Sequence, residues 1–204
     1  MFKENTVNAT TQTTLVIVPG LRDHVTEHWQ TLLEVKLAKV RRVVSVPPLR
    51  EDGLNCAARV EAIQKTVQSV KGPIVFVAHS GGVIMLVHWA QKYRHTVKGA
   101  LLAAPPDFDM PLPPGYPTLE TLRVNGWLPV PACRLPFPTL VAASTNDPLA
   151  SYSAVEVMAT NWGSVLVNVG AVGHLNPASG FGEWPRAEHL LQQIETATFS
   201  NTSA

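Results

Sequence analysis

Short runs of apolar, often β-branched residues alternate along this chain with segments of helical length, and this alternation limits the fold more than any other feature. Six such runs occur, at residues 15–18, 42–46, 74–78, 99–104, 139–144 and 164–169. Their apolar residues are nearly continuous and do not alternate with polar ones, which is typical of strands buried on both faces of a parallel sheet. The sequence therefore predicts about six parallel strands.

Helical patterns occupy the intervals between these runs. They cover residues 25–39, 55–70, 82–94, 151–162 and 185–197. Parallel strands need crossover connections, and right-handed crossovers place helices on both faces of the sheet. We therefore expect an α/β fold with a doubly wound sheet, in which ligands bind beyond the carboxyl ends of the strands.

The length of 204 residues suits one domain, 1–204, with polar tails at 1–14 and 198–204. The first fourteen residues lack the apolar core of a secretory signal, and no apolar run approaches the length of a membrane span. We therefore expect a soluble, cytoplasmic protein. The net charge of +1 and the charged fraction of 15% give no excess that favours nucleic acid or an anionic membrane. Small neutral or mixed-polarity molecules are the expected partners.

Two cysteines, Cys56 and Cys133, lie far apart in dissimilar contexts. That spacing forms neither a disulfide framework nor a metal-ligand pattern. We expect both to be reduced and structural, and the sequence predicts no metal site.

Residues 105–138 interrupt the β-α rhythm and contain ten of the seventeen prolines. Proline fixes φ and removes a hydrogen-bond donor, so this segment is expected to be an irregular excursion over the strand ends, with one short helix at 118–124. It is either a surface loop or a wall of a binding cleft with Phe108, Leu122 and Trp127 as apolar lining.

Ser80 stands directly after the third apolar run and directly before a helical pattern. With Ala78 two residues before it and Gly82 two after, the segment approaches the G-x-S-x-G pattern of a nucleophile elbow, where a strained strand-to-helix turn exposes a serine. Alanine is the smallest possible departure from the first glycine. The alternative is a serine that only caps the next helix.

A nucleophilic serine needs a histidine base and an acid that orients the base, and in this kind of sheet the chain order is serine, acid, histidine. Asp147 follows the fifth strand, and His174 lies in a glycine-rich loop after the last strand. Asp147 could instead cap a turn or a helix, and Asp107 is the reserve candidate for the acid.

The remaining histidines near this constellation are expected to serve other purposes. We expect packing roles for His79, which directly precedes Ser80 in the turn, and for His88, two helical turns along. We expect His189 to be exposed on the last helix.

Attack on a carbonyl also needs donors for the developing oxyanion. The backbone N–H of Gly81 follows the nucleophile, and that of Leu21 lies in the loop after the first strand. We expect these two N–H groups to form the oxyanion hole. Arg22 and His24, in the same loop, are candidates for shaping the cleft entrance or binding a polar group of the substrate.

These residues together resemble the small serine hydrolases of the α/β-hydrolase superfamily that are related to retinoblastoma-binding protein 9. The resemblance covers about 15–197 and is carried by VPG followed by HW, by VAHSGG around Ser80, by LPFPTLVAASTNDP and by GHLNPASGFGEWP. It implies a reduced α/β-hydrolase fold with Ser80, Asp147 and His174 as catalytic residues. The loop after the first strand has fewer glycines than many relatives. The retinoblastoma-binding property does not carry over, because Ala58 takes the acidic place in the nearest match, LNCAA.

The motifs leave three functions to compare. The leading one is a serine hydrolase that cleaves a small carboxylic ester, or an amide, through an acyl-enzyme without a cofactor. The second is a binding module that keeps the triad shape but turns over little or nothing. A nucleotide- or flavin-binding sheet is disfavoured, because the chain lacks G-x-G-x-x-G and G-K-[ST] after its first strand and has Pro19 at that turn.

Overall fold

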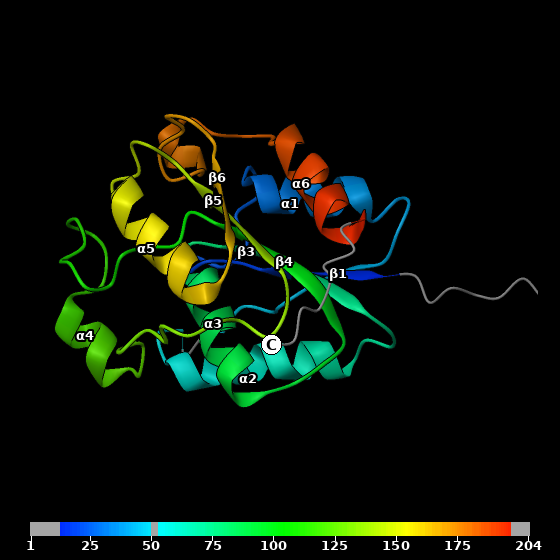
Figure 1. The fold of residues 1–204 in the computed structure, drawn as a ribbon, viewed down its shortest axis with the longest axis horizontal. Coiled ribbons are helices and arrows are strands. Elements are labelled where there is room, and N and C mark those ends of the chain that lie inside the picture. Colours follow the sequence, from blue (N-terminus) through cyan, green and yellow to red (C-terminus); the bar gives the residue numbers. More distant parts are fainter. Residues whose placement is uncertain (1–12, 50–52, 197–204) are drawn as a thin grey trace, which may run out of the picture.

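The computed structural model describes residues 13–49 and 53–196, which build one six-stranded sheet (Figure 1). The strands are β1 (Thr14–Val18), β2 (Val43–Ser45), β3 (Ile74–His79), β4 (Val97–Ala103), β5 (Thr139–Ala143) and β6 (Val165–Asn168). All are parallel, in the order β2-β1-β3-β4-β5-β6. The predicted α/β fold with six parallel strands is confirmed.

The predicted polar tails lie almost wholly outside the described residues. Within the first of them, Thr13 and Thr14 are buried, and Thr14 already belongs to β1. The strand therefore begins one residue earlier than the apolar run indicates.

In the described part of the chain, six α-helices connect or follow the strands. They are α1 (Trp29–Leu37), α2 (Cys56–Gln68), α3 (Gly81–Lys92), α4 (Leu119–Val124), α5 (Tyr152–Trp162) and α6 (Pro185–Thr196), with a short 3-10 helix at Pro177–Ser179. In Figure 1, α1 and α6 lie together on one side of the sheet, and α2 and α3 lie on the other. This is the doubly wound arrangement expected from the β-α alternation.

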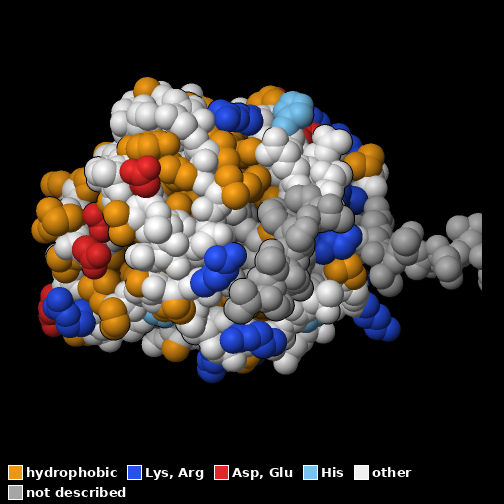
Figure 2. Space-filling view, in the orientation of Figure 1, with side chains coloured by type: hydrophobic (Ala, Val, Ile, Leu, Met, Phe, Trp, Pro, Cys, Tyr) orange, Lys and Arg blue, Asp and Glu red, His pale blue; other side chains and the backbone are white. Residues whose placement is uncertain are grey.

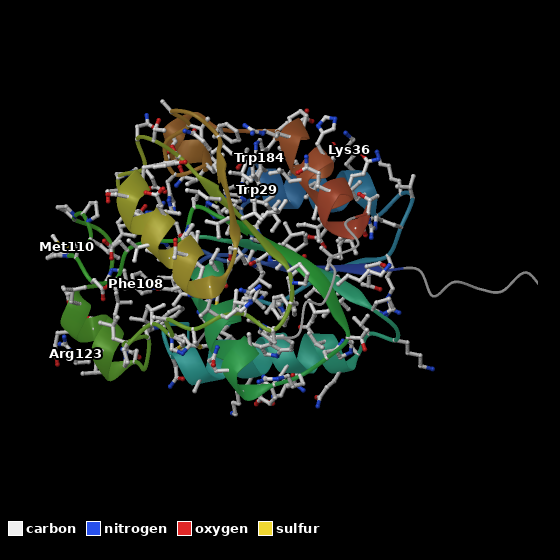
Figure 3. The ribbon with its side chains drawn as sticks, viewed as in Figure 1. Trp29, Lys36, Phe108, Met110, Arg123 and Trp184 are labelled. Carbon is white, nitrogen blue, oxygen red and sulfur yellow. The ribbon has the colours of Figure 1, made fainter. Side chains whose placement is uncertain are left out.

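Two apolar layers hold the helices against the sheet. One packs α2, α3 and α5 on the sheet and includes Phe76 and Trp89, whose rings meet edge to face at 5.0 Å. The other packs α1 and α6, where Trp29 and Trp184 meet edge to face at 4.8 Å (Figure 3). Because the central strands are buried on both faces, the sheet forms a stiff base for the loops at its carboxyl edge.

The two outermost strands differ from the expectation that every strand is buried on both faces. β2 is only half-buried, and Val165 in β6 is 54% exposed. An edge strand has a neighbour on one side only, and the helices do not extend fully over it. The apolar sequence alone does not distinguish such a strand from a central one.

The first helix begins later than predicted, at Trp29 instead of about residue 25. His28 caps it, and its Nδ1 accepts a hydrogen bond from the Gln30 N–H. Residues 19–28 therefore form a loop at the carboxyl end of β1, next to the expected position of the nucleophile.

The surface shows no concentration of basic side chains on the face seen in Figure 2, where Lys and Arg are separated by neutral surface among the described residues. Within that part of the chain, no helix combines the length and the apolar character needed to cross a membrane.

Candidate active site

Ser80 occupies a sharp turn between β3 and α3, with φ 55° and ψ −130°. A positive φ is strained for a residue with a side chain, and such strain concentrates at functional sites. The Ser80 N–H donates to the Ala103 carbonyl at 2.9 Å, which ties the turn to the end of β4. The Ser80 side chain makes no capping hydrogen bond to α3, so the alternative of a simple helix cap does not describe its hydroxyl.

The residues on either side of Ser80 explain how the turn is accommodated. A Cβ on Gly82 would lie 2.4 Å from the Val18 carbonyl oxygen and 2.6 Å from that of Pro19, so only glycine lets α3 approach β1 this closely. Ala78 is fully buried and pairs in regular register with Val18 and Leu102. Its methyl group fits within the sheet, and Ser80 keeps its strained conformation.

A chain of hydrogen bonds connects Ser80 to two later loops. The Ser80 Oγ lies 2.8 Å from His174 Nε2, and His174 Nδ1 lies 2.8 Å from Asp147 Oδ2 and 3.0 Å from Oδ1. The His174 and Asp147 side chains are 4% and 2% exposed. In this geometry His174 can accept the serine proton while Asp147 holds the imidazole and stabilises its charged form.

Asp147 and His174 follow β5 and β6, whose carboxyl ends lie side by side. Asp147 Oδ1 also accepts the Leu149 N–H at 2.8 Å. The carboxylate therefore caps the local turn, as the alternative interpretation predicted, and also contacts His174. The reserve acid, Asp107, accepts the Asp109 N–H at 2.9 Å within its own turn.

Asn146 and Ser144, which the sequence motifs did not single out, join these two loops. Asn146 Oδ1 accepts the Gly173 N–H at 2.7 Å and the Ser144 hydroxyl at 2.9 Å. Ser144 Oγ in turn accepts the Val172 N–H at 3.2 Å. Both residues precede the candidate acid in the motif ASTNDP. Their polar character and their position next to Asp147 were the signal in the sequence that could have identified them.

The two expected oxyanion donors lie close together. A Cβ on Gly81 would lie 3.6 Å from the Leu21 backbone nitrogen, and both residues line the same cleft as Ser80. No backbone hydrogen bond outside the helices and strands of the described residues uses either N–H as donor. Both groups are therefore available for a ligand oxygen.

Arg59, on α2, holds the loop that carries Leu21. Its guanidinium donates to Asp23 Oδ1 at 3.0 Å and to the Leu21 carbonyl at 3.3 Å, and its Nε donates to the Gly53 carbonyl. The Arg59 side chain is 6% exposed. None of the motifs for the catalytic residues covers α2, so no sequence signal pointed to this residue.

Two further histidines lie close to His174: His79 packs against it, and His28 packs against His79. The ring centroids of His79 and His174 are 4.9 Å apart, and those of His28 and His79 are 4.6 Å apart. Burial lowers the pKa of His79 well below its ordinary value, and the nearby His174 lowers it further. Burial, with a further contribution from His174, lowers the pKa of His28 to about 4. Both rings are therefore neutral near pH 7.

His79 does more than the predicted packing. Its Nε2–H donates to the His174 carbonyl at 2.8 Å, which helps to fix the backbone of the candidate base. His88 lies farther along α3, where its Nε2 contacts the Trp127 carbonyl at 3.1 Å. His189, on α6, is exposed, as predicted.

The cleft in front of Ser80 is bounded by the β1–α1 loop and by the start of the proline-rich excursion. From the excursion it takes Pro106, Phe108, Leu112 and Tyr116, and the Arg22 guanidinium lies 5.6 Å from the centroid of the Tyr116 ring. Figure 3 shows Phe108 nearer the sheet than Met110, which is 61% exposed. The excursion thus forms a wall of the cleft and not merely a surface loop.

Three residues that were expected to line this cleft do not line it. Trp127 and Leu122 are fully buried and do not line the cleft, because they pack into the core behind it. Trp127 meets Phe108 edge to face at 5.9 Å and so supports the lining from behind. His24 is also absent from the lining, and its Nε2 lies 3.6 Å from Glu34 Oε2.

The two cysteines are free and apart, one buried and one exposed. Burial raises the pKa of Cys56 to about 11, which suits a structural thiol. Cys133 is exposed, so the expected structural role does not apply to it. Among the described residues, no group of three or more His, Cys, Asp or Glu is placed to hold a metal ion.

Comparison with known proteins agrees with this geometry. A family model described as serine hydrolase matches residues 15–193. A structure described as a YdeN-like hydrolase from Pectobacterium atrosepticum is 30% identical, with 90% of each chain covered and a TM-score of 0.69. The search of curated proteins finds no match.

Two more distant structures share the fold. The ydeN gene product of B. subtilis is 18% identical, covers 91% of this chain and 100% of its own, and has a TM-score of 0.68. Est1E from Butyrivibrio proteoclasticus, solved with ferulic acid bound, is 14% identical with 90% of each chain covered and a TM-score of 0.66.

Proposed function

Because this chain belongs to the serine hydrolase family, in the α/β-hydrolase superfamily, we propose that it cleaves small carboxylic esters through an acyl-enzyme on Ser80. The observation that carries the proposal is the continuous hydrogen-bond chain from Ser80 Oγ through His174 to Asp147. Esters are favoured over amides because lone-pair donation from nitrogen makes an amide carbonyl carbon less electrophilic, so a serine hydroxyl attacks an ester more readily.

In the first half of the proposed reaction, the Ser80 Oγ attacks the ester carbonyl carbon while His174 Nε2 takes the hydroxyl proton. The carbonyl oxygen becomes an oxyanion, which the Leu21 and Gly81 N–H groups stabilise. His174 then returns the proton to the departing alkoxide, so that an alcohol leaves and the acyl group stays on Ser80.

In the second half, a water molecule attacks the acyl-enzyme. His174 takes a proton from this water, the same oxyanion site is used again, and Ser80 leaves with the proton from His174. Asp147 stabilises the imidazolium in both halves. The neutral state of His28 and His79 helps, because neither neighbour adds a positive charge beside the His174 imidazolium.

The test compares the wild-type protein with Ser80→Ala on short p-nitrophenyl esters and on fluorophosphonate labelling. We expect the variant to lose labelling and at least about 10³-fold in kcat, because the nucleophile is gone. Ser153→Ala, an exposed serine on α5, is the matched control and keeps full activity. Labelling that persists in Ser80→Ala would exclude Ser80 as nucleophile, and a wild-type protein that never reacts would favour the binding module.

Two finer assignments are part of the proposal. Within the family, the chain groups with relatives of retinoblastoma-binding protein 9, as the order of its motifs supports, and a family tree tests this grouping. The proposed location is the cytoplasm, which cell fractionation followed by fluorophosphonate labelling tests.

A further inference from the structure

His28 lines the same cleft as Ser80, Gly81 and His174, yet the proposed reaction gives it no role. It stands at the end of the β1–α1 loop, directly before α1. An inference about this residue rests on the proposed function, because it concerns the substrate that the same site would take.

The hydrogen bond at its Nδ1 determines where the His28 proton lies. The Gln30 N–H donates to His28 Nδ1 at 3.2 Å, so Nδ1 carries the lone pair and Nε2 carries the hydrogen in the neutral ring. Gln30 is itself fixed, because its side-chain amide donates to the Val77 carbonyl at 2.9 Å and to the Val18 carbonyl at 3.2 Å. The Gln30 side chain therefore bridges β1 and β3, and it anchors the residue whose backbone N–H holds the His28 ring.

The proton on Nε2 is unused. No described residue accepts a hydrogen bond from His28 Nε2, and this nitrogen is not among the buried polar atoms that lack a partner. The residue is 9% exposed, and what it exposes borders the cleft. A preorganised donor thus borders the site where a substrate would lie.

The chemistry of this donor favours an uncharged acceptor. Burial and the nearby His174 keep the pKa of His28 at about 4, so the ring carries no charge near pH 7. The lining around it is largely apolar, with Leu21, Val25, Phe108 and Leu112. An ether, hydroxyl or keto oxygen suits such a pocket better than a carboxylate, whose desolvation an uncharged donor offsets poorly.

We propose that the Nε2–H of His28 donates a hydrogen bond to an uncharged substrate oxygen other than that of the scissile carbonyl. The preferred substrates are then small esters that carry an ether, hydroxyl or keto oxygen near the reacting group.

The test uses pairs of esters that differ by one oxygen. On the acyl side, p-nitrophenyl methoxyacetate is compared with p-nitrophenyl butyrate, and on the alcohol side, 2-methoxyethyl acetate is compared with butyl acetate. The variant is His28→Asn, because the side-chain oxygen of the introduced asparagine can still cap α1 while the distal donor is gone. The ratio of kcat/KM within each pair cancels the intrinsic reactivity of the esters and any general loss of activity.

We expect His28→Asn to lower the preference for the oxygen-bearing ester by about threefold to tenfold in one of the two pairs, as for the loss of one neutral hydrogen bond. His189→Asn, the same change on α6 away from the cleft lining, leaves both ratios as in the wild type. Unchanged ratios in both pairs for His28→Asn would overturn the proposal.

A binding measurement separates this inference from the proposed function. In the Ser80→Ala background, calorimetric affinities for the same esters need no turnover, and the same loss of preference is expected on adding His28→Asn. If the wild-type protein hydrolyses no ester but this binding preference depends on His28, the hydrolase proposal fails while the subsite stands. If the affinity ratios also stay unchanged, the subsite is excluded.

Discussion

At the scale of single residues, the chemistry of the site depends on which side chains carry a charge. Asp147 is the carboxylate that contacts His174, while the two nearest histidines, His28 and His79, are kept neutral by burial and by His174 itself. A positive charge on His174 therefore has a stabilising partner and no competing cation among these rings. This arrangement suits the proton transfers that are proposed for His174.

Arg59→Lys tests how far the loop that carries Leu21, the proposed oxyanion donor, depends on one buried side chain. A lysine has a single ammonium group and does not reach the Gly53, Leu21 and Asp23 acceptors together. Because Leu21 would be held less firmly, we expect kcat to fall by about tenfold with KM within about twofold of the wild type. Steady-state ester kinetics and the rate of fluorophosphonate labelling measure the effect.

Arg123→Lys is the matched control, since Arg123 forms an exposed ion pair with Glu120 on α4. It should leave both rates unchanged. A rise in KM alone in Arg59→Lys would contradict positioning of the oxyanion donor and would instead indicate a binding role.

At the scale of elements, the two small residues that flank Ser80 between β3 and α3, Ala78 and Gly82, have different structural requirements. Gly82 is needed because α3 passes the carbonyl groups at the end of β1, whereas Ala78 is an ordinary strand residue in the core. The departure from the usual first glycine therefore falls where a methyl group is tolerated.

Ala78→Gly should keep kcat/KM within about threefold of the wild type, because Ser80 keeps its turn. The free energy of unfolding should fall by about 1–2 kcal/mol, since glycine weakens a strand and a buried methyl is lost. Urea denaturation and ester assays measure both quantities. A large gain in activity would mean that Ala78 does distort the turn.

Gly82→Ala should give the opposite pattern, since its Cβ would lie 2.4 Å from the Val18 carbonyl oxygen and the nearest atoms are all backbone. We expect loss of activity together with a marked loss of stability, measured in the same assays. A stable and fully active Gly82→Ala protein would contradict the close approach of α3 to β1.

At the scale of the whole molecule, the buried histidines make stability depend on pH. The folded pKa of His28 is about 4 and the ordinary value is 6.5, so the unfolded chain binds more protons between these values. The free energy of unfolding must then fall as pH falls from about 6.5 towards 4. His79, whose pKa is also lowered, acts in the same direction.

His28→Asn removes the part of this dependence that comes from His28. Between pH 7 and pH 5, we expect the wild type to lose about 1–2 kcal/mol more of its free energy of unfolding than the variant does. Urea denaturation at the two pH values measures the difference. His189→Asn, at an exposed site on α6, should follow the wild type, and equal losses in all three proteins would mean that His28 titrates normally in the folded state.

The order and type of the main elements could be predicted from the sequence. Continuous apolar runs separated by amphipathic segments leave little choice other than a parallel sheet with helices on both faces, and they also determine that Asp147 and His174 follow successive strands. The turn around Ser80 could be predicted as well, because a serine between a buried strand and a helix, followed by Gly82, is a pattern of adjacent residues. These features depend on periodicity and short-range spacing, which a sequence carries directly.

Only the tertiary structure decided which side chains meet across the strand ends. Arg59 reaches Leu21, Gln30 bridges β1 and β3, and His28 lines the cleft beside Ser80, through contacts between residues far apart in the chain. The structure likewise placed Trp127 behind the cleft wall and not on it. Such contacts depend on how helices and loops pack in three dimensions. A small shift of one loop is enough to bury a residue that would otherwise line the cleft.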